Sequence, residues 1–361
     1  MILIQTVVPD YRVPVFREIH RLIPDAFKVL SGHGHFTIGI DNQGIGEPWH
    51  TEVQNYFFFK RKLCWQRGIC RFCLNPDVIV IEANPRVLST FFLVLLRRLF
   101  RKPTVVWGHV YSTQGAASFS NRFRHLFFKL ADKVLCYTYS QAKELTSIKG
   151  FNASDVSFAP NSVLSQADCQ ESEFNERAGN VLYVGRLIPA KRPQLLIRGF
   201  RQALSKLNPE TRLEIVGDGP ELLPCRQLVK ELGIEGRVDF HGHVSEIPNL
   251  RKIHSRALFT VAAGYVGLSV IHSIGFGVPV LIADVEVHSP EIEACKSGDN
   301  CVFFEARNII ALADGIIDFF EAKELWLSRR ADLSLFIRKN YTVEKMASQI
   351  VEVANSTKPT K

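Results

Sequence analysis

Short apolar runs of strand length alternate with amphipathic stretches along most of the chain. Apolar residues between these runs recur at the spacing of a helix that buries one face, as in Val15, Ile19 and Leu22. Near-continuous apolar strands separated by such helices are typical of parallel sheets that are covered on both faces. The pattern therefore predicts an α/β protein, with strands at 2–8, 77–81, 104–107, 132–137, 156–160, 180–184, 212–216, 257–263 and 280–283.

The pattern is interrupted once, near the middle of the chain. Residues 164–179 are polar and almost without periodicity, and we expect a linker at 166–179. A length of 361 residues suits two domains better than one core. We therefore expect an N-terminal Rossmann-like domain at 1–165 and a second such domain at 180–340, followed by an amphipathic helix within 341–361.

The stretch from Gly264 to Pro279 has the strongest signal for chemistry. It lies between two apolar strands and contains a glycine-bearing turn followed by helical spacing. This arrangement puts Val266, Gly267 and Leu268 at a helix N-terminus, where backbone N–H groups favour an anion such as a diphosphate. A plain strand-to-helix turn, with glycine present only for tight geometry, is the alternative.

This stretch resembles the signature of family 4 glycosyltransferases, which are retaining enzymes of the GT-B fold. Gly267-Leu268 and Gly277-Val-Pro-Val280 match the family pattern, but Gly264 and His272 stand at its two glutamate positions, with the spacing kept. A subgroup of bacterial members has a similar Gly-Tyr-Val-Gly-Leu-Ser-Val-Ile-His pattern, so the resemblance indicates a variant site. It implies two Rossmann-like domains facing across a cleft, with a terminal helix crossing back to the first domain.

Two cations are predicted to hold the donor diphosphate. Arg186 directly follows a strand and Lys191 comes five residues later, so both side chains can converge on one anion. Negative charge grows on a diphosphate leaving group as the glycosidic bond breaks, and cations stabilise it. Family 4 members use a Gly-Arg and a following Lys here. The resemblance implies a metal-independent reaction, and no paired carboxylates stand out as a metal site.

Other site residues follow from strand ends and from the resemblance. His109 comes just past a parallel strand, where such folds bind ligands, and family members often carry a histidine here that reaches the donor sugar. Arg12, after the first strand, is a candidate for acceptor or donor phosphate. The resemblance puts Val244 near the nucleobase and Glu291 near donor hydroxyls or ribose. We expect His272 to be neutral and to contact ribose or phosphate.

Ten cations lie between residues 60 and 102, opposed only by Asp77 and Glu82. Because aromatic residues are interleaved with them, we expect this tract to bind an anionic membrane surface. Nucleic acid, which we do not expect as a partner, is the rival use of such charge, and two helices with solvated basic faces are the structural alternative. The scattered cysteines, the absence of a basic signal-peptide start and the shortness of the apolar runs indicate a cytoplasmic protein.

The resemblance therefore implies retaining transfer of a sugar from a nucleotide sugar to a saccharide or lipid-linked acceptor, in cell-surface polysaccharide or glycolipid synthesis. Two alternatives stay open. One is a GT-B sugar epimerase or phosphorylase, although an epimerase would need carboxylates at the sugar. The other is a non-catalytic nucleotide-sugar-binding or membrane-binding protein, since both family glutamates are replaced.

Overall fold

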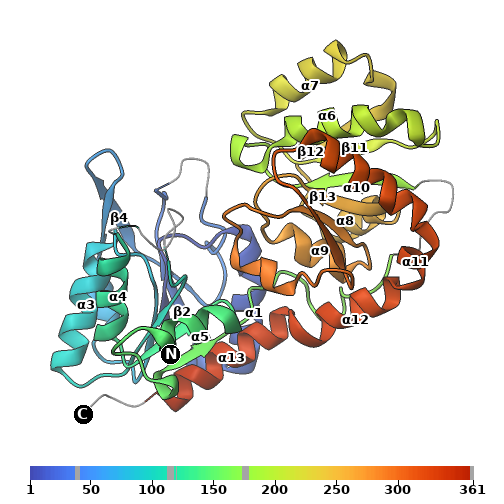
Figure 1. The fold of residues 1–361 in the computed structure, drawn as a ribbon. Helices are drawn as coiled ribbons and strands as arrows, with labels where there is room; N and C mark the ends of the chain where they lie inside the picture. Colours follow the sequence, from blue (N-terminus) through green and yellow to red (C-terminus); the bar gives the residue numbers. More distant parts are fainter. Residues whose placement is uncertain (37–40, 112–117, 119, 173–178, 358–361) are drawn as a thin grey trace. The chain divides into compact units, whose positions relative to one another are not determined.

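The computed structural model describes residues 1–36, 41–111, 118, 120–172 and 179–357, and the chain divides into two compact units (Figure 1). The first unit is Met1–Val163 with Thr342–Lys361, and the second is Leu164–Tyr341. Each unit is a Rossmann-like α/β domain built on a parallel sheet, as the alternating pattern predicts. The two units together have the elements of a GT-B fold.

The first unit contains a seven-stranded parallel sheet in the order β3-β2-β1-β6-β7-β8-β9. Its elements are β1 (Ile2–Ile4), α1 (Val13–Leu22), β2 (Lys28–Ser31), β3 (His50–Glu52), β4 (Gln54–Phe58), β5 (Leu63–Arg67), α2 (Ile69–Cys73), β6 (Ile79–Glu82), α3 (Leu88–Leu99), β7 (Thr104–Trp107), α4 (Ser120–Leu130), β8 (Lys133–Cys136), α5 (Tyr139–Ser147), β9 (Val156–Phe158) and α13 (Val343–Ser356).

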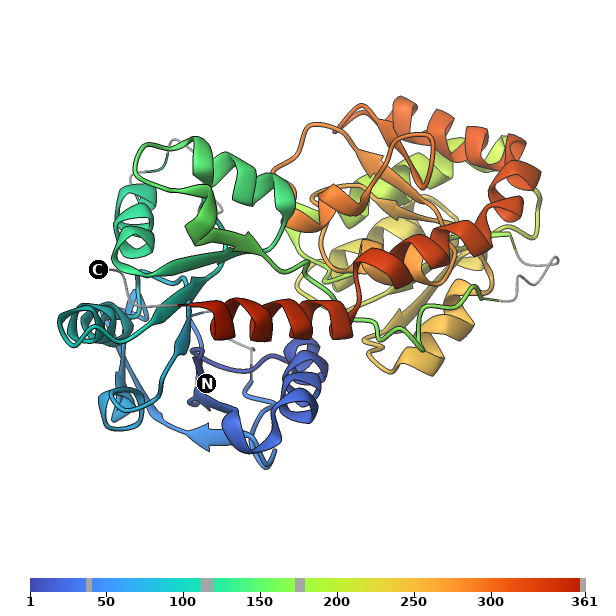
Figure 2. The ribbon, with the colours of Figure 1, turned by 90° about the horizontal axis from the view of Figure 1, so that it is seen from below.

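Successive residues of these strands enter different cores because side chains alternate between the faces of a sheet. Leu3 belongs to the core under α1 and α13, whereas Ile4 belongs to the core under α2 to α5. Figure 2 shows α13, in dark red, lying along the sheet beside α1, and the two helices are in contact. The last helix of the chain therefore completes the first unit.

A separate antiparallel hairpin, β4–β5, is attached to the first unit and packs on α3. Sequence periodicity did not predict this hairpin. The basic tract at residues 60–102, which begins here, contains strands as well as helices. The tract contains the end of the hairpin, α2, β6 and α3.

The second unit contains a six-stranded parallel sheet in the order β12-β11-β10-β13-β14-β15. Its elements are β10 (Asn180–Val184), α6 (Pro193–Ala203), β11 (Leu213–Val216), α7 (Leu222–Glu231), β12 (Val238–Gly242), α8 (Ile247–His254), β13 (Ala257–Ala262), α9 (Ser269–Gly275), β14 (Val280–Ala283), β15 (Cys301–Phe304), α10 (Ile309–Glu321), α11 (Lys323–Ser328) and α12 (Arg330–Asn340).

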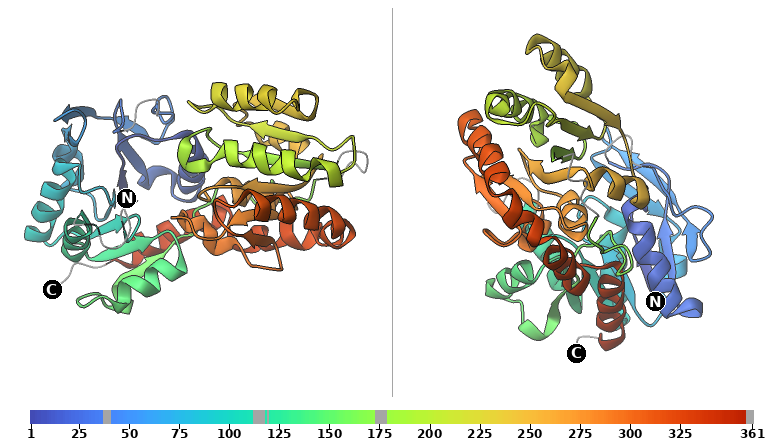
Figure 3. Two further views of the ribbon diagram at one scale, coloured as in Figure 1. Left: turned by 45° about the horizontal axis from the view of Figure 1, so that its top comes forward. Right: turned by 90° about the vertical axis from the view of Figure 1, so that its right-hand side faces the viewer.

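Helices cover both faces of this second sheet (Figure 3). Helix α6 packs between α7 and α10 on one face, and α9 packs against α12 on the other. The strands β10, β13 and β14 are neighbours and run parallel, so the loops that follow them leave the same edge of the sheet. In open parallel sheets, this carboxyl edge is where ligands bind.

Candidate functional site

Four predicted site residues lie in loops that leave the carboxyl edge of the second sheet. Arg186 and Lys191 follow β10, Gly267 follows β13, and Glu291 lies in the short 3-10 helix η7 (Pro290–Ala294) that follows β14. Helix η7 packs against α9. The sheet order β10-β13-β14 makes these three loops neighbours, although about a hundred residues separate the first loop from the last.

The loop that carries Arg186 and Lys191 is braced by backbone on two sides. A Cβ atom on Gly264 would lie only 2.3 Å from the carbonyl oxygen of Ala190, and one on Gly217 would lie 1.9 Å from that of Gly185. The Leu187 amide also donates to the carbonyl of Asp218. The glycine at 264 is therefore required by packing, and a glutamate cannot be placed there without moving the backbone.

Lys191 is the most perturbed cation of the second unit's loops. Its Nζ atom donates to the carbonyl oxygen of Tyr265 at 3.0 Å and lies 3.9 Å from the centroid of the Tyr265 ring. Burial of the ammonium group lowers the pKa of Lys191 to about 8, and the nearby carboxylate of Glu291 opposes this change. The site thus contains a desolvated cation that an anion would stabilise further.

Tyr265 brings the other charged groups of these loops into one environment. Burial raises the pKa of its phenol, the guanidinium of Arg186 opposes that rise, and Glu291 adds to it. Arg186 is exposed and Glu291 is buried. A Cβ atom on Gly267 would lie 3.1 Å from Lys191 Nζ. The structure therefore brings Arg186, Lys191, Gly267 and Glu291 together around one tyrosine.

The turn before α9 does not offer all of the amides expected from the sequence. The Val266 N–H donates to Nδ1 of His288 at 3.0 Å, so this amide already has a partner. Within the described ranges, no group accepts from the amides of Gly267 and Leu268. His288 was missed by sequence reasoning because only the return of the chain after β14 brings it to residue 266.

His272 lies in the middle of α9, a helix of seven residues. Its ring stacks on that of Phe276, with centroids 6.0 Å apart and planes 18° apart. Burial lowers the pKa of His272 to about 4, and Asp168 opposes this change. The imidazole is therefore neutral at pH 7, mainly because of desolvation rather than because of the helix N-terminus.

Val244 lies apart from the group around Tyr265. It follows β12, the edge strand of the second sheet, and it is half-buried. Two strands, β11 and β10, separate β12 from β13 in the sheet. Val244 therefore lies at the same carboxyl edge of the second sheet as the residues around Tyr265, but at the far end of that edge.

The first unit brings together the two remaining predicted residues, Arg12 and His109, on the ring of Tyr137. The centroids of the His109 and Tyr137 rings are 4.6 Å apart, and the Arg12 guanidinium carbon lies 5.2 Å from the Tyr137 centroid. Desolvation by the surrounding protein lowers the pKa of His109, as do the charges of Arg124 and Arg12. His109 itself remains exposed, so water offsets part of this desolvation.

Arg12 is not an exposed loop arginine. It ends the short 3-10 helix η1 (Asp10–Arg12) and is only 3% exposed. Its guanidinium donates to Oδ1 of Asn161 at 2.7 Å and lies 4.7 Å from the Trp107 ring centroid. The Arg12 side chain therefore joins the first loop of this unit to the segment that follows β9, and it packs against Trp107 and Tyr137.

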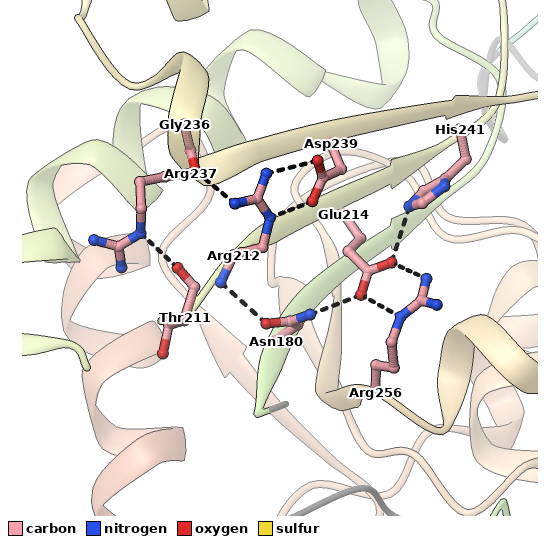
Figure 4. Close-up of polar contacts among 9 residues, drawn as sticks. All are labelled: Asn180, Thr211, Arg212, Glu214, Gly236, Arg237, Asp239, His241 and Arg256. Carbon is pink, nitrogen blue, oxygen red and sulfur yellow. Dashed lines mark hydrogen bonds and ion pairs between the residues drawn. The ribbon is translucent and has the colours of Figure 1, made fainter. Parts of the chain in front are cut away.

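A second polar cluster lies at the opposite end of the strands of the second unit (Figure 4). Glu214 accepts hydrogen bonds from Asn180 at 2.7 Å and from Nε of Arg256 at 3.0 Å, and it pairs with His241 at 2.9 Å. These residues lie near the amino ends of their strands, except His241. The cluster ties four neighbouring strands together and lies away from the site loops.

The cysteines do not add a metal site to this picture. Among the residues that the structure describes, no group of three or more His, Cys, Asp or Glu side chains is arranged to hold a metal ion. Cys70 and Cys73 lie on α2, and burial raises the pKa of each thiol.

Comparison with known proteins finds a family model that matches most of the second unit. Residues 165–334 match the family model described as glycosyl transferases group 1. An uncharacterized glycosyltransferase of Haemophilus influenzae is 24% identical over 299 residues, which cover 82% of this chain and 80% of that protein. The lipopolysaccharide 1,6-galactosyltransferase of Salmonella typhimurium is 25% identical over 51% of this chain, which is matched to 52% of that protein.

Solved structures share the fold of nearly the whole chain. Anabaena HepE in complex with UDP has a TM-score of 0.74 at 16% identity, with 98% of this chain and 99% of that chain covered. The lipopolysaccharide outer core galactosyltransferase WaaB has a TM-score of 0.70 at 16% identity, with 98% of both chains covered. Residues 165–334 therefore resemble the group 1 glycosyl transferases, the relatives support a transferase enzyme, and the solved structures show that the chain has a GT-B fold.

Proposed function

We propose that this protein transfers a sugar from a nucleotide diphosphate sugar to an acceptor hydroxyl, with retention of the anomeric configuration. The observation that carries the proposal is the desolvated ammonium group of Lys191. It lies beside Gly267 and shares the environment of Tyr265 with Arg186 and Glu291. A diphosphate would complete this charge arrangement, because its negative charge would stabilise the desolvated ammonium group further.

In the proposed reaction, Arg186 and Lys191 stabilise the negative charge that develops on the departing diphosphate. The bond between the anomeric carbon and the phosphate oxygen breaks, and the acceptor oxygen forms its bond on the same face of the sugar. The acceptor proton passes to the departing phosphate oxygen. We assign Glu291 to sugar or ribose hydroxyls, neutral His272 to ribose or phosphate, and Val244 to the base. No step requires a metal ion.

We extend the proposal to the acceptor and to the place of the reaction. The similarity to a lipopolysaccharide 1,6-galactosyltransferase and to an O-antigen biosynthesis glycosyltransferase of Escherichia coli supports a saccharide or lipid-linked acceptor. Synthesis of a cell-surface polysaccharide or glycolipid is the corresponding pathway class, and the cytoplasm is its proposed location. In this proposal His109 of the first unit acts on the donor sugar, as a neutral group that can donate or accept a hydrogen bond.

Purified protein incubated with a panel of nucleotide sugars tests the proposal. We expect release of nucleoside diphosphate that accelerates with a hydroxyl-bearing acceptor, and a product sugar with the donor's anomeric configuration. Replacing Arg186 with Ala should lower kcat/KM, and the corresponding loss of transition-state stabilisation should be on the order of 2–4 kcal/mol. Arg201→Ala, an exposed arginine on α6, is the matched control.

Three results would contradict the proposal or its parts. Unchanged turnover in both Arg186→Ala and Lys191→Ala would remove the diphosphate assignment. Epimerised donor without transfer would favour the epimerase alternative. Unchanged kcat in His109→Asn would remove the first unit's histidine from the mechanism.

A further inference from the structure

Helix α3 is apolar on the side that does not face its own core. Leu93 and Val94 are fully buried under the helix, whereas Leu88, Phe92, Leu95 and Leu99 are exposed. The four exposed residues are spaced by four, three and four positions, so they form one stripe about 16 Å long. Leu99 is 75% exposed. A helix on the surface of a protein normally presents polar residues on this side. The packing of the first unit therefore does not explain the apolar stripe of α3.

The β4–β5 hairpin adds exposed aromatic residues next to this stripe. Phe58, Phe59 and Trp65 are all exposed, and Phe59 is 74% exposed at the tip. The tip residues Phe59, Lys60 and Arg61 have φ angles of 51°, 53° and 63°. Left-handed backbone costs such residues roughly 1–2 kcal/mol each, and Gly or Asn would avoid much of that cost. The tip therefore carries large and basic side chains at positions where the backbone alone would favour Gly or Asn.

The hairpin, α3 and α4 form one continuous surface. The Trp65 and Phe92 rings have centroids 6.3 Å apart, which joins the hairpin to the stripe. Helix α4 contacts α3 and contributes exposed Phe123 and Leu126. Figure 1 shows α3 and α4 side by side, with the β4 hairpin above them. Exposed apolar surfaces of this extent mark interaction sites.

The charged residues around this surface indicate which kind of partner it binds. Between residues 54 and 131 only Asp77 and Glu82 are acidic, and Glu82 accepts hydrogen bonds from Thr6. The exposed cations at its edges come from the hairpin, α2 and the end of α3, and they are Lys60, Lys62, Arg67, Arg71, Arg98 and Arg101. An apolar stripe flanked by cations matches the interface of an anionic bilayer.

Two arginines of the basic tract at residues 60–102 bind backbone carbonyls within the fold. Arg97 is fully buried, and its guanidinium donates to the carbonyls of Cys73 at 2.5 Å and Pro103 at 2.7 Å. The Arg86 guanidinium donates to the carbonyls of Arg61 and Lys62, which helps to hold the hairpin. Arg97 therefore supports the surface from within, and the exposed Arg86 is engaged with the hairpin backbone. Contact is left to the exposed cations and to the apolar residues between them.

We propose that the surface formed by the β4–β5 hairpin, α3 and α4 docks on an anionic lipid bilayer, with Phe59 and Leu99 inserted at the headgroup boundary. A second copy of the same surface is a poor occupant, because it would bring like charges together. Among the helices that the structure describes, none has the length and apolar character of a membrane span. The proposal does not depend on sugar transfer.

Vesicle flotation tests the proposal with full-length protein. We expect binding to vesicles of phosphatidylcholine with 30% phosphatidylglycerol, and weaker binding to phosphatidylcholine alone or at 0.5 M NaCl. Phe59→Ser combined with Leu99→Ser should weaken binding to the anionic vesicles by about tenfold or more. Leu223→Ser, an exposed leucine on α7 of the second unit, should leave vesicle binding unchanged.

Thermal unfolding reports the fold of the variants separately from vesicle binding. The proposal is overturned if neutral and anionic vesicles bind equally. It is also overturned if the double variant retains both the Tm of the parent and full vesicle binding. A dimer in light scattering that the double variant dissociates would assign the surface to a second copy instead.

Discussion

Lys191→Met should stabilise the protein and at the same time weaken nucleotide binding. The reason is that burial disfavours the ammonium form of Lys191, and no carboxylate is hydrogen-bonded to this group among the residues that the structure describes. A pKa lowered from 10.5 to about 8 corresponds to about 3 kcal/mol of unfavourable free energy for the charged form. Methionine fills a similar volume and carries no charge.

Part of this gain is offset by contacts that methionine cannot make. The hydrogen bond from Nζ to the Tyr265 carbonyl is worth about 1 kcal/mol, and the cation–π contact contributes a similar amount. The expected net stabilisation at pH 7 is therefore about 1–2 kcal/mol, or a rise in Tm of roughly 2–6 °C for a domain of this size. Lys230→Met, at an exposed lysine on α7, should change Tm little.

The pH dependence has a definite sign. Between pH 8 and 10.5 the unfolded chain binds more protons at Lys191 than the folded chain, so this group's contribution to stability rises with pH. Binding of a diphosphate favours the ammonium form, so the affinity for the nucleoside diphosphate of the proposed donor should fall as pH rises above about 8. The Met variant should lose roughly tenfold to a hundredfold in this affinity at pH 7, and it should lack this decline.

Thermal unfolding and titration calorimetry of the parent and the two methionine variants, from pH 7 to 9.5, measure these effects. A Tm of Lys191→Met several degrees below that of the parent would show that the ammonium group is well compensated. Unchanged affinity for the nucleoside diphosphate in the same variant would show that the diphosphate binds elsewhere. Either result would refute the reasoning from desolvation.

Three further perturbations test other parts of the second unit. Gly264→Ala should lower stability by roughly 2–4 kcal/mol in denaturant unfolding because of the backbone clash, whereas Gly236→Ala, which has open space, should not. Glu214→Gln should cost roughly 2–3 kcal/mol. Burial alone would raise the pKa of Glu214, but hydrogen bonds from Arg256 and Asn180 hold it lower, so this stability should be lost as pH falls below about 4.5 in the parent only. His272→Ala should raise the donor KM and His272→Glu should retain part of the activity; equal UDP affinity of the Ala variant and the parent would remove His272 from the site.

Local periodicity carried much of the fold. The strand predicted at 180–184 matches β10, and that at 280–283 matches β14. These segments are buried on both faces, so their apolar character is visible without knowing their neighbours. The hairpin was missed because its exposed positions carry the aromatic residues Tyr56, Phe58 and Trp65, whereas the polar Gln66 is buried, so the sequence does not show the apolar-in, polar-out alternation of a half-buried strand.

The sequence by itself determined the α/β class, the positions of the main strands along the chain, and the loops that carry Arg186, Lys191 and Glu291. These features depend on residues close together in the chain. Only the tertiary structure decided that Lys191 lies on Tyr265, that the Val266 amide is taken by His288, and that a glutamate cannot be placed at Gly264. The physical reason is that burial, backbone approach and charge pairing arise between residues far apart in the chain, which no local pattern encodes.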